Sequence, residues 1–379
     1  LFLLSFNFSN SQATVSSVSS FDASATLNIG SSIDIIVSFN APVTVTGTPK
    51  LKLETGLTDT KIDYVSGSGS PFLTFTYVVI EGNTSSDLDY VNTSALTLEG
   101  GTITGPGNIA ANLTLPSPGG TGSLAGIGDD EKNFVVDGVR PTITITASQI
   151  SNGGNFNGNL SLTFTTSEAT SDFIEGDITL SNGTLSSFNA VSSTSYTATF
   201  TPSAQGAATI DVVSGKFTDS AGNTSSAATQ FSWIYDSIAP TNQDDVFPSA
   251  AYETVGGTVT IVSSGTATNQ VWIAPAGTSS FSASSTMTQA DSGTSTSMTA
   301  PTTAGTYYIY VIDQTGNVSS ASTAALTVNI AGFTLSTTTG TVTEAGGTAT
   351  FTVVLDSRPD SDVVISVTTT ETCVVTVSA

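Results

Sequence analysis

A six-residue pattern occurs twice in this sequence and sets the approximate size of its folding units. Residues 137–142 read DGVRPT and residues 236–241 read DSIAPT, so both copies are Asp-x-(Val or Ile)-x-Pro-Thr. The two aspartates, Asp137 and Asp236, lie 99 residues apart, and a β-sandwich domain takes about 100 residues. Because proline cannot continue a central strand, each copy predicts a domain boundary.

A second pattern, Asp-x-x-Gly-Asn, occurs shortly before each predicted domain end. Residues 219–223 read DSAGN and residues 313–317 read DQTGN, while residues 104–108, TGPGN, keep Gly-Asn but lack the aspartate. The two complete copies lie between strand-like runs. They predict tight hairpins in which Asp219 or Asp313 accepts backbone N–H bonds and glycine supplies a positive φ.

Short runs of alternating apolar and polar residues predict strands throughout the chain. Examples are LTFTY at 73–77, SLTFT at 161–165, YTATF at 196–200 and FTVVL at 351–355. No stretch sustains a helical period, and serine and threonine make up about a third of the residues. We therefore expect an all-β fold of tandem β-sandwich domains arranged as beads on a string, and the resemblance given below implies that these domains are Ig-like. The expected segments are a signal remnant at 1–13, modules at 14–138, 139–238 and 239–330, and a truncated module at 331–379.

The charge balance excludes several classes of function. Thirty acidic and seven basic residues give a net charge of −23, and histidine is absent. Phosphate binding needs a basic face, so nucleic acid and anionic membranes are not expected partners. Without histidine there is no Ser-His-Asp system and no imidazole ligand. The single cysteine, Cys373, excludes a thiolate zinc site and an internal disulfide.

The first residues are apolar, LFLLSFNF at 1–8, and a polar stretch to Ala13 follows. They resemble the apolar core and small-residue cleavage site of a secretory signal, although a first β-strand is the alternative. No other apolar run reaches the ~20 residues of a membrane helix. We expect an exported chain, secreted or at a bacterial cell surface, that continues beyond residue 379.

Longer segments resemble known modules. Residues 139–241, with GNLSLTFTTSEAT, DFIEGDITLSNGTLSSF and KFTDSAGNTSSA, resemble a bacterial Ig-like domain of surface and adhesin-type proteins. Residues 14–138, with VSFNAPVTVTGTPKLKLETG, resemble a related repeat, and 239–330 is Ig-like in outline. Residues 331–379, with TVTEAGGTATFTVVLDSRPDSDVVISV, resemble the first half of a Calx-beta module. The resemblance implies extracellular, non-catalytic repeats, some of which depend on calcium.

Acidic residues gather at the two predicted boundaries and suggest a shared cation site. A hard cation such as Ca²⁺ takes six to eight oxygen ligands, which two adjoining domains can supply together. The alternative is that these are solvated turn carboxylates, and both interpretations stay open here. The candidate ligands are Asp129, Asp130 and Asp137 at the first boundary, and Asp236, Asp244 and Asp245 at the second.

Other carboxylates have simpler explanations. Hairpin capping explains Asp219 and Asp313, with a cation-ligand role as the alternative, and Asp87 and Asp89 are expected to face solvent along a strand. A group at Asp172, Glu175 and Asp177 fits a solvated bend, with a loop cation site as the alternative. The Calx-beta resemblance implies acidic ligands at Glu344, Asp356, Asp360 and Asp362, but the missing half of that module would have to complete the site.

Three functions remain open from the sequence. The first is a structural or adhesive array that binds an unknown surface ligand, a glycan or a protein. The second is a carbohydrate-binding accessory region of a larger secreted enzyme, in which aromatic residues would stack on sugars. The third is a glycoside hydrolase, which needs two carboxylates in one cleft. We expect no enzyme here and interpret the aromatics as core residues: Trp233, Trp272, Tyr307, Tyr308 and Tyr310.

Overall fold

The protein is described by a computed structural model covering residues 12–127, 132–336, 349–356, 362–366 and 368. Within these residues, helical structure is limited to η1 (Pro106–Asn108), η2 (Glu175–Asp177) and α1 (Gln243–Val246). The predicted all-β fold class is confirmed. The chain divides into two compact units, one of residues 1–153, 159–203 and 208–233, the other of residues 154–158, 204–207 and 234–379.

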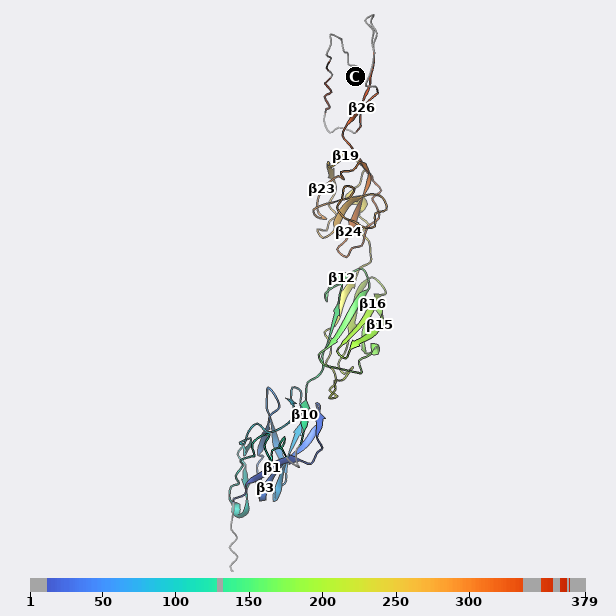
Figure 1. The fold of residues 1–379 in the computed structure, drawn as a ribbon. Coiled ribbons are helices and arrows are strands. Elements are labelled where there is room, and N and C mark those ends of the chain that lie inside the picture. Colours follow the sequence, from blue (N-terminus) through green and yellow to red (C-terminus); the bar gives the residue numbers. More distant parts are fainter. Residues whose placement is uncertain (1–11, 128–131, 337–348, 357–361, 367, 369–379) are drawn as a thin grey trace, which may run out of the picture. The chain divides into compact units, whose positions relative to one another are not determined.

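The first sandwich, in the blue to cyan part of Figure 1, has a seven-stranded and a three-stranded sheet. The larger sheet has the order β1-β3-β6-β5-β4-β8, and β9 pairs with β3. In the smaller sheet β10 pairs in parallel with β2 and antiparallel with β7. The strands are β1 (Val15–Ser20), β2 (Ala25–Leu27), β3 (Ser32–Thr46), β4 (Lys50–Leu53), β5 (Thr60–Ser66), β6 (Ser70–Val78), β7 (Thr84–Ser85), β8 (Leu96–Thr97), β9 (Thr102–Thr104) and β10 (Phe134–Asp137).

Side chains from both sheets form one core in this sandwich. Strand β3 buries Ile33, Ile35 and Val37, and the exposed Asp34 lies between the first two. Phe134 of the smaller sheet is fully buried in the same cluster. The two-residue period of a strand thus places the apolar side chains of β3 on the inner face.

The second sandwich, green in Figure 1, consists of two four-stranded sheets. Their orders are β11-β13-β16-β15 and β12-β18-β17-β14, and β12 pairs in parallel with β18. The predicted runs at 161–165 and 196–200 lie in β13 and β16. The strands are β11 (Ile143–Ala147), β12 (Asn155–Phe156), β13 (Leu160–Thr166), β14 (Thr179–Ser181), β15 (Gly183–Ser192), β16 (Ser195–Pro202), β17 (Gly206–Asp211) and β18 (Phe231–Tyr235).

Aromatic rings dominate the core of the second sandwich. Phe200 and Trp233, one from each sheet, are in edge-to-face contact with centroids 4.7 Å apart. Phe173 lies between β13 and η2 and is 3% exposed. Its ring contacts four others at centroid distances of 5.0–5.9 Å, those of Phe164, Phe188, Tyr196 and Phe217. The expectation that Trp233 is a core residue is confirmed.

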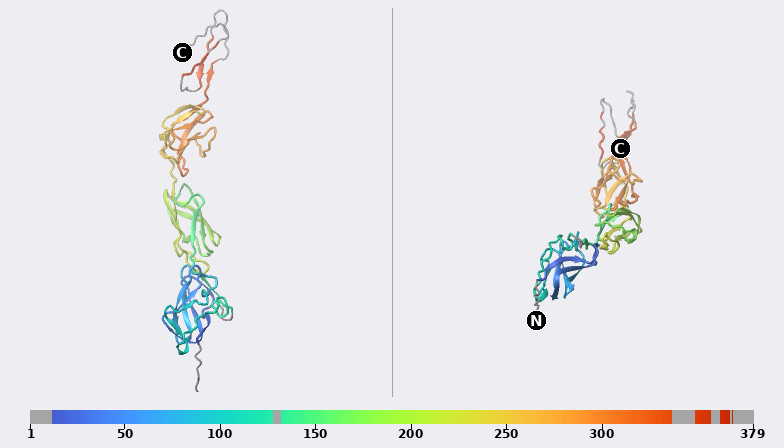
Figure 2. Two further views of the ribbon diagram at one scale, coloured as in Figure 1. Left: turned by 90° about the vertical axis from the view of Figure 1, so that its left-hand side faces the viewer. Right: turned by 60° about the horizontal axis from the view of Figure 1, so that its bottom comes forward.

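The third sandwich, yellow to orange, has a five-stranded sheet β19-β25-β24-β21-β22 and a two-stranded sheet β20-β23. Here β19 pairs in parallel with β25. Figure 2 shows the same regions in two further views. The strands are β19 (Ala251–Thr254), β20 (Thr258–Thr260), β21 (Gln270–Ala274), β22 (Thr288–Gln289), β23 (Ser297–Thr299), β24 (Gly305–Ile312) and β25 (Leu326–Asn329).

Strands β21 and β24 are covered on both faces. Their inner face packs in the main core with Ile273 and Ile309. The outer face carries Trp272 and Tyr310, 5% and 3% exposed, under Phe281 and neighbouring loop residues. The Tyr310 hydroxyl donates to the Pro275 carbonyl at 3.1 Å, which ties that loop to the sheet. These aromatics are core residues, as the sequence predicts.

The described residues after 330 form one strand pair, β26 (Phe333–Leu335) with β27 (Val353–Leu355). The Calx-beta resemblance of 331–379 stays a prediction. Residues 1–11 of the expected signal remnant at 1–13 lie outside the described residues, as do Glu344, Asp360 and Cys373. Ala13, the expected small residue of the cleavage site, is buried in the core of the first sandwich.

We predict that truncating Phe173 destabilises the second sandwich. Phe173→Ala removes a ring packed against four others, so the free energy of unfolding is expected to fall by about 3–5 kcal/mol. Calorimetry of the full chain measures the transition of this sandwich. The control is Ile174→Ala, because Ile174 is 60% exposed and a surface truncation changes stability by at most about 0.5 kcal/mol. Equal effects of the two variants would contradict the packing described here.

Candidate functional site at the first linker

The aspartate of the repeated linker pattern forms the same turn in both copies. Strand β10 ends at Asp137, whose Oδ1 accepts the amide of Val139 at 3.1 Å. In the second copy, Asp236 Oδ1 accepts the amide of Ile238 at 3.2 Å. An aspartate that bonds the amide two residues ahead stabilises a turn. The recurring aspartate therefore shapes the main chain of each linker.

The two Asp-x-x-Gly-Asn segments form matching hairpins, as the sequence predicts. Asp219 Oδ1 accepts the amides of Ala221 and Asn223, each at 2.9 Å. Asp313 Oδ1 accepts the amides of Thr315 and Asn317, also at 2.9 Å. Antiparallel bridges flank both turns, and the glycine of each has a φ near +90°.

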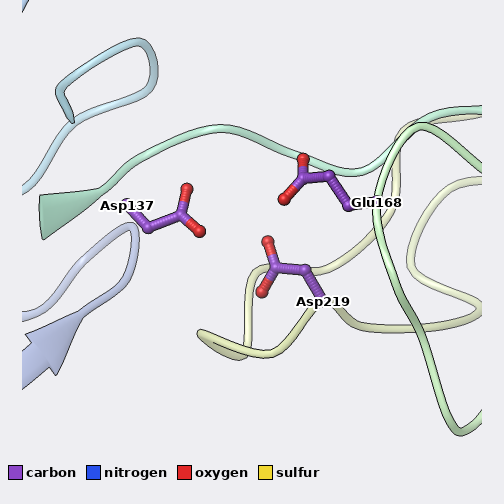
Figure 3. A group of neighbouring side chains, drawn as sticks. All are labelled: Asp137, Glu168 and Asp219. Atoms are coloured by element: carbon purple, nitrogen blue, oxygen red, sulfur yellow. The ribbon is translucent and has the colours of Figure 1, made fainter.

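Three carboxylates meet beside the first linker. One oxygen each from Asp137, Glu168 and Asp219 lies within 4.8 Å of the other two. Figure 3 shows the carboxylates directed toward one another. Asp137 comes from the end of β10, Glu168 from the loop after β13, and Asp219 from the hairpin. Asp219 is buried and the other two are half-buried. We call these residues the junction cluster.

Glu168 shows the electrostatic cost of this arrangement. Burial raises the pKa of its carboxyl, and the charges of Asp137 and Asp219 raise this pKa further. Like charges at such distances disfavour the ionised form, which a proton or a cation can relieve. Carboxylate oxygens suit a hard cation such as Ca²⁺, and the rest of its six to eight ligands would be carbonyls or waters. The junction cluster therefore has the chemistry of part of a calcium site.

Of the four predicted calcium ligands among the described residues, the structure brings one together with other carboxylates. Asp137 belongs to the junction cluster, whereas Asp129 and Asp130 lie outside the described residues. At the second boundary, Asp236 also accepts Gln205 Nε2 at 3.0 Å. Asp244 accepts the amide and hydroxyl of Thr323 at 2.6 and 2.9 Å. Asp245 lies in the first turn of α1. Among described residues, the junction cluster is the single group of three such ligands.

Sequence reasoning missed Glu168, and for Asp219 it preferred the hairpin role to a ligand role. Glu168 follows β13 in TSEAT, where no spacing links it to the linker. Asp219 serves in both places, because its side chain caps the hairpin and also belongs to the junction cluster. The three carboxylates come together only when the linker and the second sandwich have folded, so no spacing in the sequence indicates them.

Asp89 corrects another expectation, since it does not face solvent. It is 7% exposed, because its two carboxylate oxygens accept the amides of Tyr90 and Gly119, each at 2.9 Å. Its neighbourhood is irregular and not a continuous strand, which removes the alternation on which the expectation rested.

Asp172 fits a hydrogen-bonded bend. Burial raises the pKa of Asp172, but hydrogen bonds from Thr170 and Thr218 outweigh burial and hold this pKa below its ordinary value. The carboxylate thus accepts hydrogen bonds from Thr170 in its own loop and from Thr218, whose bridge to Thr224 flanks the hairpin.

No helix among the described residues is long and apolar enough to cross a membrane. The family model of the bacterial Ig-like domain matches residues 137–234, which cover the second sandwich and the linker aspartate before it. No curated protein matches the sequence.

Several solved structures are similar at low identity. The structure described as invasin, a bacterial integrin-binding protein, is 12% identical with a TM-score of 0.29, covering 85% of this chain and 61% of that one. The chicken CNTN1 FN1–FN3 domains are 10% identical with a TM-score of 0.27, covering 84% and 98%. Yersinia pseudotuberculosis InvD is 13% identical with a TM-score of 0.23, covering 83% and 96%. These likenesses are too distant to carry an inference about function.

We predict that Glu168→Gln raises the melting temperature at pH 7 in EGTA. The pKa of Glu168 is raised in the folded chain. Its ionised form therefore costs stability, and this cost develops as pH rises above the ordinary value of 4.5. The advantage of the variant should be present at pH 7 and disappear near pH 4. Glu175→Gln, at an exposed position, is the control. A variant no more stable than the wild type at pH 7 would contradict this account.

Proposed function

We propose that this chain is part of an extracellular, non-catalytic repeat array of the surface adhesin type. The observation that supports it most is the succession of sandwiches with the same linker turn and hairpin. The middle sandwich also matches the bacterial Ig-like domain family. Each of the three has its own two-sheet architecture. Such modules serve to place a binding element at a distance from the cell.

The chemistry of the described residues favours an array over a glycan-binding accessory region. Sugar binding uses exposed aromatic faces, but Trp272 and Tyr310 are 5% and 3% exposed beneath a loop. Trp233 is 1% exposed inside a core. The rings of Trp233, Trp272 and Tyr310 are therefore packed against other side chains and have no exposed face for a sugar. We therefore rank a carbohydrate-binding accessory region of a larger secreted enzyme below the adhesin-type array.

We further propose that Ca²⁺ binds the junction cluster. Its three carboxylates come from the linker, the loop after β13 and the hairpin, so one ion would join three segments. The raised pKa of Glu168 marks the uncompensated negative charge that such an ion would neutralise. Asp129 and Asp130 precede the same linker in the sequence. They are the other two candidate ligands that we propose at the first boundary. At the second boundary, Asp236, Asp244 and Asp245 remain candidate ligands.

Calcium should raise the melting temperature of the wild-type chain relative to EGTA. At free Ca²⁺ about 100 times the dissociation constant, binding to the folded state contributes about 2.7 kcal/mol. The calcium-induced shift should shrink in Glu168→Gln and persist in Glu175→Gln, as measured by calorimetry at pH 7. Identical melting of the wild type in Ca²⁺ and EGTA would sink the calcium proposal and leave the array proposal standing.

Surface display tests the array itself. Bacteria that display the full chain are expected to adhere several-fold better to immobilised host-surface proteins than bacteria that display none. The fluorescent full chain is applied in parallel to a glycan array. Saturable binding to a defined glycan without protein adhesion would replace the adhesin proposal by the carbohydrate-binding alternative.

A further inference from the structure

The two hairpins use the amide of their asparagine in the same way. Asn223 Nδ2 donates to the main-chain oxygen of Asp137 at 2.9 Å and to Asp219 Oδ2 at 2.9 Å. Asn317 Nδ2 donates to the main-chain oxygen of Asp236 at 2.8 Å and to Asp313 Oδ2 at 2.9 Å. In both copies the hairpin therefore holds the linker that precedes its own sandwich.

The amide oxygen of each asparagine accepts a hydrogen bond from a loop that precedes the linker. Asn223 Oδ1 accepts the amide of Ile29, just after β2, at 2.8 Å. Asn317 Oδ1 accepts Asn157 Nδ2, just after β12, at 3.2 Å. One asparagine thus binds the linker with its donor and the preceding loop with its acceptor.

The glycine of each hairpin makes room for this approach. Gly222 and Gly316 have φ of 93° and 90°, where a side chain is strained. A Cβ at Gly222 would lie 3.1 Å from Asn28 Nδ2, and a Cβ at Gly316 would lie 3.7 Å from Asn157 Nδ2. Both neighbours are asparagines of the preceding loop, but only at Gly222 would the Cβ crowd its neighbour.

The aspartate of the hairpin prepares the asparagine for this role. It bonds the amide of the asparagine with one oxygen and the Nδ2 with the other. For Asp313, burial raises the pKa, but bonds from Thr315 and Asn317 outweigh burial and lower this pKa. The hydrogen bonds to the aspartate thus orient the asparagine side chain within its own hairpin.

The first sandwich provides a natural contrast. Its hairpin segment lacks the aspartate and contains η1, and Asn108 is exposed with a φ of 60°. Asn223, by comparison, is 2% exposed.

We propose that the Asp-x-x-Gly-Asn hairpin is a docking site for the preceding module, in which the asparagine binds the linker carbonyl and a loop group of that module. The site uses neutral amide groups and occurs at both linkers. The junction cluster, among described residues, occurs only at the first. Docking therefore goes beyond the proposed function and does not require calcium.

Hydrogen exchange of the full chain in EGTA tests the docking site. The probes are peptides that contain the linker amides of residues 137–139 and 236–238. Asn223→Ala should accelerate exchange in the first linker only, and Asn317→Ala in the second only. Because each loses bonds to both linker and loop, we expect roughly tenfold acceleration. Asn108→Ala is the matched control and should change neither linker.

A loop variant separates docking from hairpin folding. Asn157→Ala removes the side-chain donor that reaches Asn317 Oδ1 and leaves the hairpin intact. It should accelerate exchange in the second linker by less than Asn317→Ala. Exchange in β13 and β24 reports whether the sandwiches stay folded. The docking site is refuted if Asn223→Ala and Asn317→Ala leave their linkers unchanged. It is also refuted if Asn157→Ala changes nothing while Asn317→Ala exposes β24 as well as the linker.

Discussion

The hydrogen bond from a backbone amide to a short side-chain oxygen is the interaction on which the described loops depend. The chain has no histidine, seven basic residues and one cysteine, so ion-pair networks and disulfides are scarcely available to fix its turns. Aspartates do this instead at positions 89, 137, 219, 236 and 313. Each accepts one or more main-chain amides and so provides these turns with hydrogen-bond acceptors.

This solution has an electrostatic cost where such turns converge. Asp137 and Asp219 each stabilise their own turn, and the two turns are brought together by Asn223. Glu168 then completes a group of three negative charges with no basic side chain among its members. The neutral side chain of Asn223 holds the linker and the hairpin together. The proposed cation would hold the same two segments through their carboxylates. The second linker shows the asparagine contact without an assembled carboxylate group among described residues.

Local pattern predicted what depends on local chemistry. The capped hairpins followed from residue types at fixed spacing, because Asp219 and Asp313 bond amides two and four residues away. The core positions of β13 and β16 followed from the two-residue period. Glu168 could not be predicted, because it joins Asp137 and Asp219 only through the folded second sandwich. Asp89 was assigned wrongly, since its second partner, Gly119, is 30 residues away. The bond of Asn223 to Ile29 spans 194 residues and leaves no trace in local spacing.

One further consequence follows from the parallel strand pairs. In each sandwich an early strand pairs in parallel with the last strand of that sandwich: β2 with β10, β12 with β18, and β19 with β25. In the third sandwich this early strand is also the first, since β19 precedes the other strands and β25 ends the sandwich. Tension applied to its two ends would therefore pull β19 and β25 in opposite directions along their length. The hydrogen bonds between them would bear the load together, in shear. In the first two sandwiches β1 and β11 come before the parallel pair and are antiparallel to their neighbours, so the load would reach β2 and β12 only through them.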